Sequence, residues 1–250
     1  MKQIKLLGTL FLTFLFFSSC YRIILGSVGV LDSSASFKKA SSANKEIVFI
    51  PMHHVGKQSF YEDVKNSIDS LRKEGFVFYY EGVKYSKIRD SLRNDTLAMK
   101  LRHVIGLDMR TLSLQGGYID TLDGTIAGLK KGIAERYKLV NQPKYSLYDT
   151  TVDRRVDAYL SDLMATFEEK YGKLLLTACD FNTKPTDKYK CKKTSSKEEK
   201  MFLMLLYRND LITKEILKDS HSKIVLVYGA KHFDGILKNL QQHDSTWKRN

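Results

Sequence analysis

The chain has 250 residues, which is enough for one domain with a sizeable hydrophobic core. Its 41 Lys and Arg residues exceed its 28 Asp and Glu residues, so its formal net charge is +13 at neutral pH. Such an excess can bind nucleic acid or anionic lipid. Much of it lies at residues 184–200, where no aromatic stacking pattern accompanies the lysines. We therefore expect a solvated, membrane-facing loop there and no nucleic-acid partner.

The first 19 residues have the parts of a bacterial secretory signal peptide. Lys2 and Lys5 precede an apolar run at residues 6–17, which is shorter than the roughly 20 residues that span a bilayer. The tetrapeptide Phe17-Ser18-Ser19-Cys20 is similar to a lipobox, although leucine is usual at its first position. We expect cleavage after residue 19 and a diacyl lipid on Cys20, which would anchor an exported protein to a membrane of the bacterial cell envelope. The alternative is an uncleaved anchor that continues through residues 21–31.

The rest of the chain divides into a tether and a domain. Residues 20–45 form the lipid-anchored tether. Its part from Asp32 to Lys45 is rich in Ser, Ala, Asn and Lys and can bury little apolar surface, which predicts a flexible linker. Residues 46–250 form the domain, which we expect to fold as one unit.

Two further cysteines, Cys179 and Cys191, flank a loop that is rich in Lys and Thr. Neither belongs to a Cys-x-x-Cys zinc motif. Outside the cytoplasm a disulfide can form, and it would close this loop. Two unpaired structural thiols are the alternative, and the sequence leaves both open.

In chain order, the first elements of the domain are a strand, a helix and a second strand. The apolar run EIVFIPM at residues 46–52 is too short for a helix and predicts a buried strand. Apolar residues at helical spacing predict a helix at residues 59–73, with Ser59 and Glu62 as a capping box. The run FVFYY at residues 76–80 predicts the second strand, and we expect the two strands to pair in parallel.

The second half is mainly helical until its last strand. Helical spacing predicts helices at residues 85–107, 153–171 and 198–218, with a glycine-rich loop or short helix at 115–132. The run KIVLVY at residues 223–228 predicts a strand, and a final helix begins near His232. Strands that alternate with helices predict an α/β fold, with a mainly parallel central sheet covered by helices in a single domain.

Polar side chains follow three of these strands. The first strand leads to His53-His54, the second to Glu81, and the last to Gly229-Ala230-Lys231-His232. Sites in such sheets form where strands end, so two imidazoles and a carboxylate would converge there. Such a set can hold zinc or another divalent metal, or act without metal with one His as a general base oriented by the Glu. Ordinary surface, core or capping roles are the alternative for each residue.

The segment FIPMHHVGKQSFYEDVKNSIDSLRKEGFVFYYEG resembles the opening of the TraB/GumN family, which includes the Tiki membrane-anchored proteases. That family begins with a strand, a G-x-x-H turn, a helix and a second strand that ends in Glu. It closes with a helix containing Arg-Asn, a strand, and a second G-x-x-H before a helix. This chain has Arg208-Asn209 followed by KIVLVYGAKHFDGI, in which Gly229 and His232 match the second G-x-x-H. The resemblance covers residues 46–90 and 198–240.

One position departs from the family pattern, because Pro51 replaces the Gly of the first G-x-x-H. The family His is then placed at His54, three residues after Pro51, with His53 as a weaker candidate. The matching positions imply a cleft lined by four residues, His54, Glu81, Arg208 and His232.

The resemblance implies metal-dependent hydrolysis of a peptide or a small ester. His54, Glu81 and His232 would hold a divalent ion, such as manganese, cobalt or zinc, that activates water. Arg208 would stabilise the developing oxyanion or hold a substrate carboxylate, unless it is a surface helix residue. Tyr80 and Tyr228 flank the strand ends, where they donate hydrogen bonds or pack.

Other activities are compatible with the same fold. Related folds occur in erythromycin esterases and in ChaN-type haem-binding lipoproteins, and a fold does not choose among functions. The alternatives are a non-catalytic lipoprotein that binds haem or a metal, and a metal-free hydrolase of the esterase type.

Cys20→Ser should abolish lipidation and block cleavage before residue 20, because Cys20 is the residue that the lipobox presents for modification. Labelling of cells with a fatty-acid probe measures the lipid directly. Equal labelling of the variant and the unmodified protein would contradict the prediction of a lipoprotein.

Overall fold

The computed structural model describes residues 21–87, 90–114, 117–120, 125–126, 132–143, 147–191 and 195–250. Its centre is a six-stranded sheet in the order β6-β4-β7-β2-β1-β8, and β3 and β5 form a separate pair. The strands are β1 (Lys38–Ser41), β2 (Glu46–Met52), β3 (Val55–Lys57), β4 (Val77–Tyr80), β5 (Leu139–Asn141), β6 (Arg154–Arg155), β7 (Lys223–Gly229) and β8 (Lys248–Arg249). Neighbours among β6, β4, β7 and β2 pair in parallel, whereas β1 is antiparallel to β2 and to β8. The predicted α/β class with a mostly parallel sheet is confirmed.

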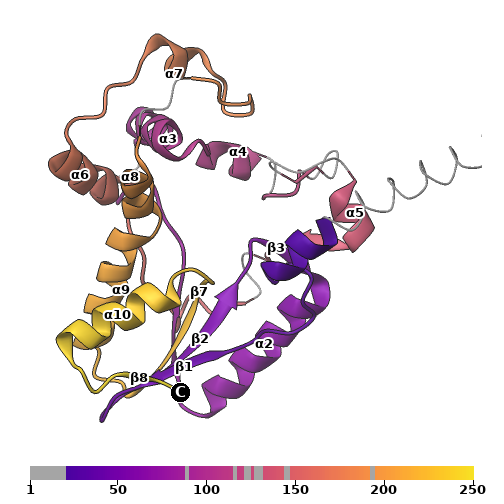
Figure 1. Ribbon diagram of the computed structural model, residues 1–250, viewed down its shortest axis with the longest axis vertical. Helices are drawn as coiled ribbons and strands as arrows, with labels where there is room; N and C mark the ends of the chain where they lie inside the picture. Colours follow the sequence, from indigo (N-terminus) through magenta and orange to yellow (C-terminus); the bar gives the residue numbers. More distant parts are fainter. Residues whose placement is uncertain are drawn as a thin grey trace, which may run out of the picture.

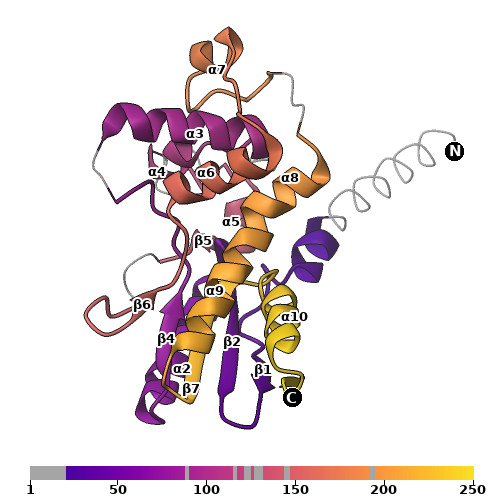
Figure 2. The same cartoon turned by 90° about the vertical axis from the view of Figure 1, so that its left-hand side faces the viewer.

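Helices cover the sheet and form a lobe beyond its upper end (Figures 1 and 2). They are α2 (Gln58–Lys73), α3 (Ser91–Ile105), α4 (Met109–Leu114), α5 (Ile133–Tyr137), α6 (Leu160–Tyr171), α7 (Ala178–Asn182), α8 (Lys197–Met201), α9 (Tyr207–Lys218) and α10 (Phe233–His243). A π-helical turn, η1 (Phe202–Leu206), joins α8 to α9. In Figure 2 the run from α8 to α9 extends from the lobe, which contains α3, α4, α6 and α7, down along the sheet.

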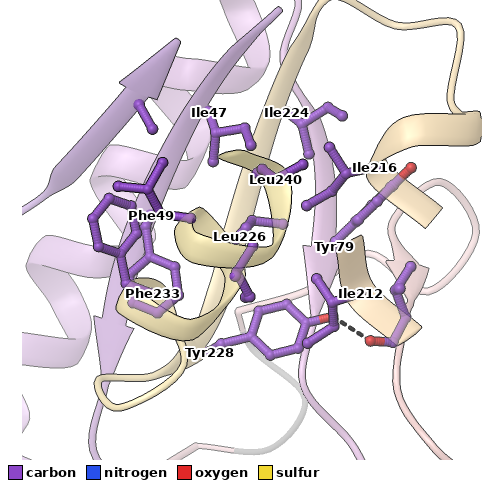
Figure 3. Packing of buried hydrophobic residues seen from close by; sticks show 14 of the residues in the cluster. Ile47, Phe49, Tyr79, Ile212, Ile216, Ile224, Leu226, Tyr228, Phe233 and Leu240 are labelled. Atoms are coloured by element: carbon purple, nitrogen blue, oxygen red, sulfur yellow. Dashed lines mark hydrogen bonds between the residues drawn. The ribbon is translucent and has the colours of Figure 1, made fainter. Parts of the chain in front are cut away.

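The sheet is buried on both faces because its central strands β2 and β7 are apolar after their first residues, Glu46 and Lys223. Side chains of β7 alternate between the two faces, as the two-residue period of a strand requires. On one face, Ile224, Leu226 and Tyr228 join residues of β2, α9 and α10 (Figure 3). On the other face, Val225 and Val227 join Phe60, Tyr61, Val64 and Ile68 of α2.

The two strands that the sequence predicts to pair directly are not neighbours. β2 and β4 are parallel members of one sheet, but β7 lies between them and pairs with both. The reason is burial, since five consecutive residues of β7, from Ile224 to Tyr228, are fully buried and require a strand or helix on every side. β7, although it comes late in the chain, therefore lies in the interior of the sheet.

The segment from Asp32 to Lys45, predicted to be a flexible linker, belongs partly to the sheet. Lys38–Ser41 forms β1, and Ala40 is buried between β2 and β8. The backbone N–H of Ala35 also donates to Asp63 of α2. The polar composition of this segment did not prevent it from forming a strand, because the backbone of β1 pairs with the edge of β2.

Three helix predictions require correction. Helix α2 begins at Gln58 after Lys57, without the side-chain cap predicted for Ser59. The helix predicted at residues 85–107 is shorter, since α3 begins after Asp90, whose side chain accepts from the N–H of Arg93. Residues 153–159 contain β6 rather than the start of α6. The prediction for residues 115–132 lies mostly outside the described residues, as do residues 1–20.

The structure joins Cys179 to Cys191 as a disulfide, which is one of the two alternatives that the sequence leaves open. Buried Arg102 donates to the backbone carbonyls of Asp180 and Thr183 within the closed loop. Together these contacts fix the loop to α3. No helix among the described residues is long and apolar enough to span a membrane.

Leu226→Ala should lower the free energy of unfolding by about 2–5 kcal/mol, because it leaves a cavity at the centre of the sheet, where Leu226 is 0% exposed. Leu92→Ala is the matched control, since Leu92 is 79% exposed on α3 and should change stability by less than about 0.5 kcal/mol. Urea unfolding of both variants measures the difference. Equal losses would contradict the central position of β7.

Candidate functional site

Three of the four predicted site residues meet at the carboxyl ends of β4 and β7. Glu81 directly follows β4, and its N–H donates to the carbonyl of Val227 in β7 at 3.1 Å. His232 lies just after β7, at the start of α10, and Arg208 reaches the same place from α9. The central position of β7 therefore brings Glu81 and His232 to adjacent strand ends.

Both carboxylate oxygens of Glu81 accept short hydrogen bonds. Arg208 Nη2 donates to Oε1 at 2.6 Å, and the N–H of Gly229 donates to Oε2 at 2.6 Å. Burial opposes ionisation, but the charges of Arg208 and His232 and these hydrogen bonds outweigh it and lower the pKa of Glu81 to about 2. A Cβ at Gly229 would lie 3.2 Å from Oε2, so glycine lets the backbone approach the carboxylate closely. Glu81 is a fixed anion at neutral pH.

Arg208 is held in place by a second carboxylate, Asp157. Arg208 Nε and Nη2 donate to the two carboxylate oxygens of Asp157 at 2.8 and 2.7 Å. Asp157 has a fully buried side chain and also accepts from the N–H groups of Gly82 and Ala158. Burial lowers the pKa of Arg208, but the hydrogen bonds and charges of both carboxylates outweigh this and raise it above its usual value. The alternative that Arg208 is a surface helix residue is wrong, because Arg208 is buried.

His232 is a neutral, oriented imidazole. Its Nδ1 lies 2.6 Å from Asn209 Oδ1, so Nδ1 carries the proton and donates it to the amide oxygen. Its Nε2 then has a free lone pair and lies 3.8 Å from Glu81 Oε1. Burial and the nearby charge of Arg208 lower the pKa of His232 to about 4. The imidazole therefore carries no charge at neutral pH, and its Nε2 is unprotonated.

A close approach of α10 to α9 makes the Asn209–His232 contact geometrically feasible. A Cβ at Gly235 would lie 2.1 Å from Asn209 Nδ2, which is a severe clash. Glycine at this position lets the amide of Asn209 fit between the two helices, with its oxygen directed to His232.

The fourth predicted residue, His54, packs against a different partner. Its exposed ring stacks on Tyr118, with the ring centroids 4.5 Å apart and the planes 8° apart. Burial and the negative charge of Glu81 raise the pKa of the Tyr118 phenol, which places this phenol within the electrostatic reach of Glu81. We define Glu81, Arg208 and His232 as the central group, and Tyr118, on which His54 stacks, senses its charge.

The other sequence candidates have packing roles. His53 packs against Phe60 and near Gly29, and its carbonyl accepts from the Tyr61 hydroxyl. Tyr80 stacks on Tyr148 with ring centroids 4.4 Å apart. The buried Tyr228 donates its hydroxyl hydrogen bond to the carbonyl of Val156 (Figure 3).

The arrangement does not fit the predicted metal set of His54, Glu81 and His232. Among the residues that the structure describes, no group of three or more His, Cys, Asp or Glu side chains could hold a metal ion. Both oxygens of Glu81 already accept hydrogen bonds, and one of the donors is the guanidinium of Arg208, whose charge repels a cation. Rearrangement of Arg208 would have to precede metal binding by this set.

Sequence reasoning missed Asp157, Asn209 and Tyr118. Asp157 follows the two-residue strand β6, which is too short to give an apolar run that marks a strand end. Asn209 belongs to the Arg-Asn pair of the family resemblance, so that motif could have indicated Asn209 as a partner of His232. Tyr118 lies in a glycine-rich segment without periodicity, and no pattern there could have indicated it.

Acidification should destabilise the protein partly through His232. The unfolded chain protonates this residue near pH 6.5, whereas the folded protein keeps it neutral down to about pH 4. The unfolded state therefore binds more protons in this interval, and the free energy of unfolding falls as the pH is lowered through it. His232→Gln removes this contribution, so its stability should depend less on pH across the interval. Urea unfolding with a chelator present tests this, and parallel pH profiles would contradict it.

Comparisons of the chain with protein-family models, with curated proteins and with solved structures found no match in any of the three. The TraB/GumN resemblance stays a prediction that rests on the residues of its two end motifs.

Proposed function

We propose that this chain is a lipid-anchored hydrolase of the bacterial cell envelope that cleaves a peptide or small ester, as its TraB/GumN resemblance implies. The observation that carries the proposal is the neutral imidazole of His232, which Asn209 orients and whose free Nε2 lies 3.8 Å from the ionised Glu81. An oriented neutral imidazole beside a carboxylate is suited to general base catalysis.

In the proposed reaction, His232 Nε2 accepts a proton from the attacking nucleophile. The side chain of His232 is only 3% exposed, which favours a small nucleophile such as water. The imidazolium that forms is stabilised by the negative charge of Glu81. It returns the proton to the leaving amine or alcohol when the acyl C–N or C–O bond breaks, which restores the neutral imidazole. Arg208 and the N–H of Gly229 keep Glu81 ionised and fixed, so Arg208 is a positioning residue here rather than an oxyanion donor.

His54 has a different part in this proposal. Its exposed ring is stacked on Tyr118, and we assign it to contact with the bound substrate rather than with the reacting atoms. A metal-dependent reaction, which the resemblance predicts, would instead require His54 as a ligand together with Glu81 and His232. The effect of replacing His54 therefore distinguishes the metal-free mechanism from the metal-dependent one.

Glu81→Gln and His232→Ala should each reduce turnover of a peptide or ester substrate by about 10²-fold or more, the usual contribution of general acid–base groups. The double variant should lose little more, because residues that act as a unit are strongly non-additive. His54→Ala should mainly raise KM. His243→Ala, on the exposed end of α10, is the matched control and should behave like the unmodified protein, and His53→Ala should be mild.

The assay is run with a chelator and then with added manganese, cobalt or zinc, and the metal content and melting temperature of each variant are measured. Activity only with metal, and a loss in His54→Ala equal to that in His232→Ala, would favour the metal-dependent mechanism. Unchanged turnover in both Glu81→Gln and His232→Ala would contradict the site itself. Bound haem or metal without hydrolysis would favour a binding lipoprotein.

A further inference from the structure

The described part of the chain opens with helical residues 21–27, directly after the predicted lipidation site. This segment presents large apolar side chains to its surroundings: Ile23 is 67% exposed, Ile24 is 52% exposed, and Val28, in the following turn, is 55% exposed. Three neighbouring β-branched apolar residues with such exposure are unusual at a surface in contact with water.

The opposite side of the same segment is fixed to the domain. Leu25 is only 6% exposed and belongs to a cluster with Val55 of β3, Leu139 of β5, and Ile133 and Ala134 of α5. The segment is therefore a part of the folded body, with one side packed and the other apolar and exposed.

The turn after the helix is also packed tightly against the domain. The N–H of Val30 donates to the carbonyl of Leu25, and Gly29 adopts a φ of +78°. A Cβ at Gly29 would lie 2.8 Å from His53 Nε2. Glycine is thus required both by the left-handed conformation and by the contact with His53.

We propose that this segment lies in the interfacial region of a lipid bilayer, with Ile23, Ile24 and Val28 directed into the acyl-chain boundary. The proposal rests on the proposed lipid anchor at Cys20. Ile23 is the third residue after Cys20, and three extended residues span at most about 11 Å. The acyl chains of Cys20 would hold these side chains within the depth of about 5–10 Å that interfacial helices occupy.

Charge on the packed elements complements anionic headgroups. Arg22 is exposed on the segment itself, and Arg136 and Lys138 are exposed on and just after α5. The exposed acidic residues nearby are Glu135 of α5 and Asp32 after the turn, so these three basic residues outnumber them by one. Basic side chains near a bilayer that contains anionic lipid strengthen binding to it.

The same contacts place the candidate site beside the membrane. Tyr118 packs against the cluster that contains Leu25, and its ring stacks on His54, the residue that we assign to substrate contact. A bilayer-bound segment would therefore hold His54 near the headgroups. The substrate class that follows is a peptide or ester carried by a membrane-bound molecule.

Ile23→Trp tests the membrane contact in the full-length protein reconstituted into vesicles with anionic lipid. Lipids brominated on the acyl chains quench tryptophan fluorescence only at close range. The added fluorescence of Ile23→Trp should be quenched, and more strongly by bromine near the headgroup than by bromine near the chain ends. Val152→Trp is the matched control, since Val152 is 64% exposed near β6 and its tryptophan should not be quenched. The one native tryptophan, Trp247, is 2% exposed and is common to both variants.

Mass analysis of the N-terminal peptide keeps this test separate from the lipid anchor. A diacylated Cys20 with unquenched Ile23→Trp would overturn the interfacial segment and leave the lipoprotein intact. An unmodified Cys20 with quenching strongest near the chain ends would show a membrane-spanning anchor and overturn both. Ile23→Asn with Ile24→Asn should lower turnover of a vesicle-bound ester while sparing a soluble ester. Equal turnover of the vesicle-bound ester would overturn the assigned substrate class alone.

Discussion

The ion group formed by Asp157, Arg208 and Glu81 is the constraint on which the rest of the site depends. Asp157 is fully buried, and a buried carboxylate without a partner costs several kcal/mol. Arg208 donates to Asp157 through its Nε and Nη2 atoms, and Nη2 also donates to Glu81. This one guanidinium therefore ties α9 to the chain that follows β6 and to the end of β4.

The position of Arg208 in turn depends on an irregularity in the helix that carries it. The π-helical turn η1 ends one residue before α9, and Arg208 is the second residue of α9. A π-helical turn shifts the angular position of all residues that follow it, and such turns frequently occur at functional sites. Without the shift, Arg208 and Asn209 would project from a different face, and neither the carboxylates nor His232 would have these partners.

The sequence was most informative where burial is uniform. The runs at residues 46–52 and 223–228 predicted β2 and β7 closely, because strands buried on both faces are apolar throughout. Glu81 and His232 could then be placed by strand ends alone. Strand order could not be predicted, because nothing local in β4 or β2 specifies that β7 pairs with both. The role of Asp157 was hidden for a similar reason, since its partner lies 51 residues away and its own strand has only two residues.

The contact between Gly235 and Asn209 has a consequence for the recognition of distant relatives. The space next to Asn209 Nδ2 excludes even a methyl group at position 235. Any protein that orients its histidine by the same amide must therefore have glycine three residues after that histidine. The pattern Arg-Asn, then a buried strand, then His-x-x-Gly is consequently a sharper sequence signature of this arrangement than the two G-x-x-H motifs. It would distinguish chains that share the oriented imidazole from chains that share only the sheet.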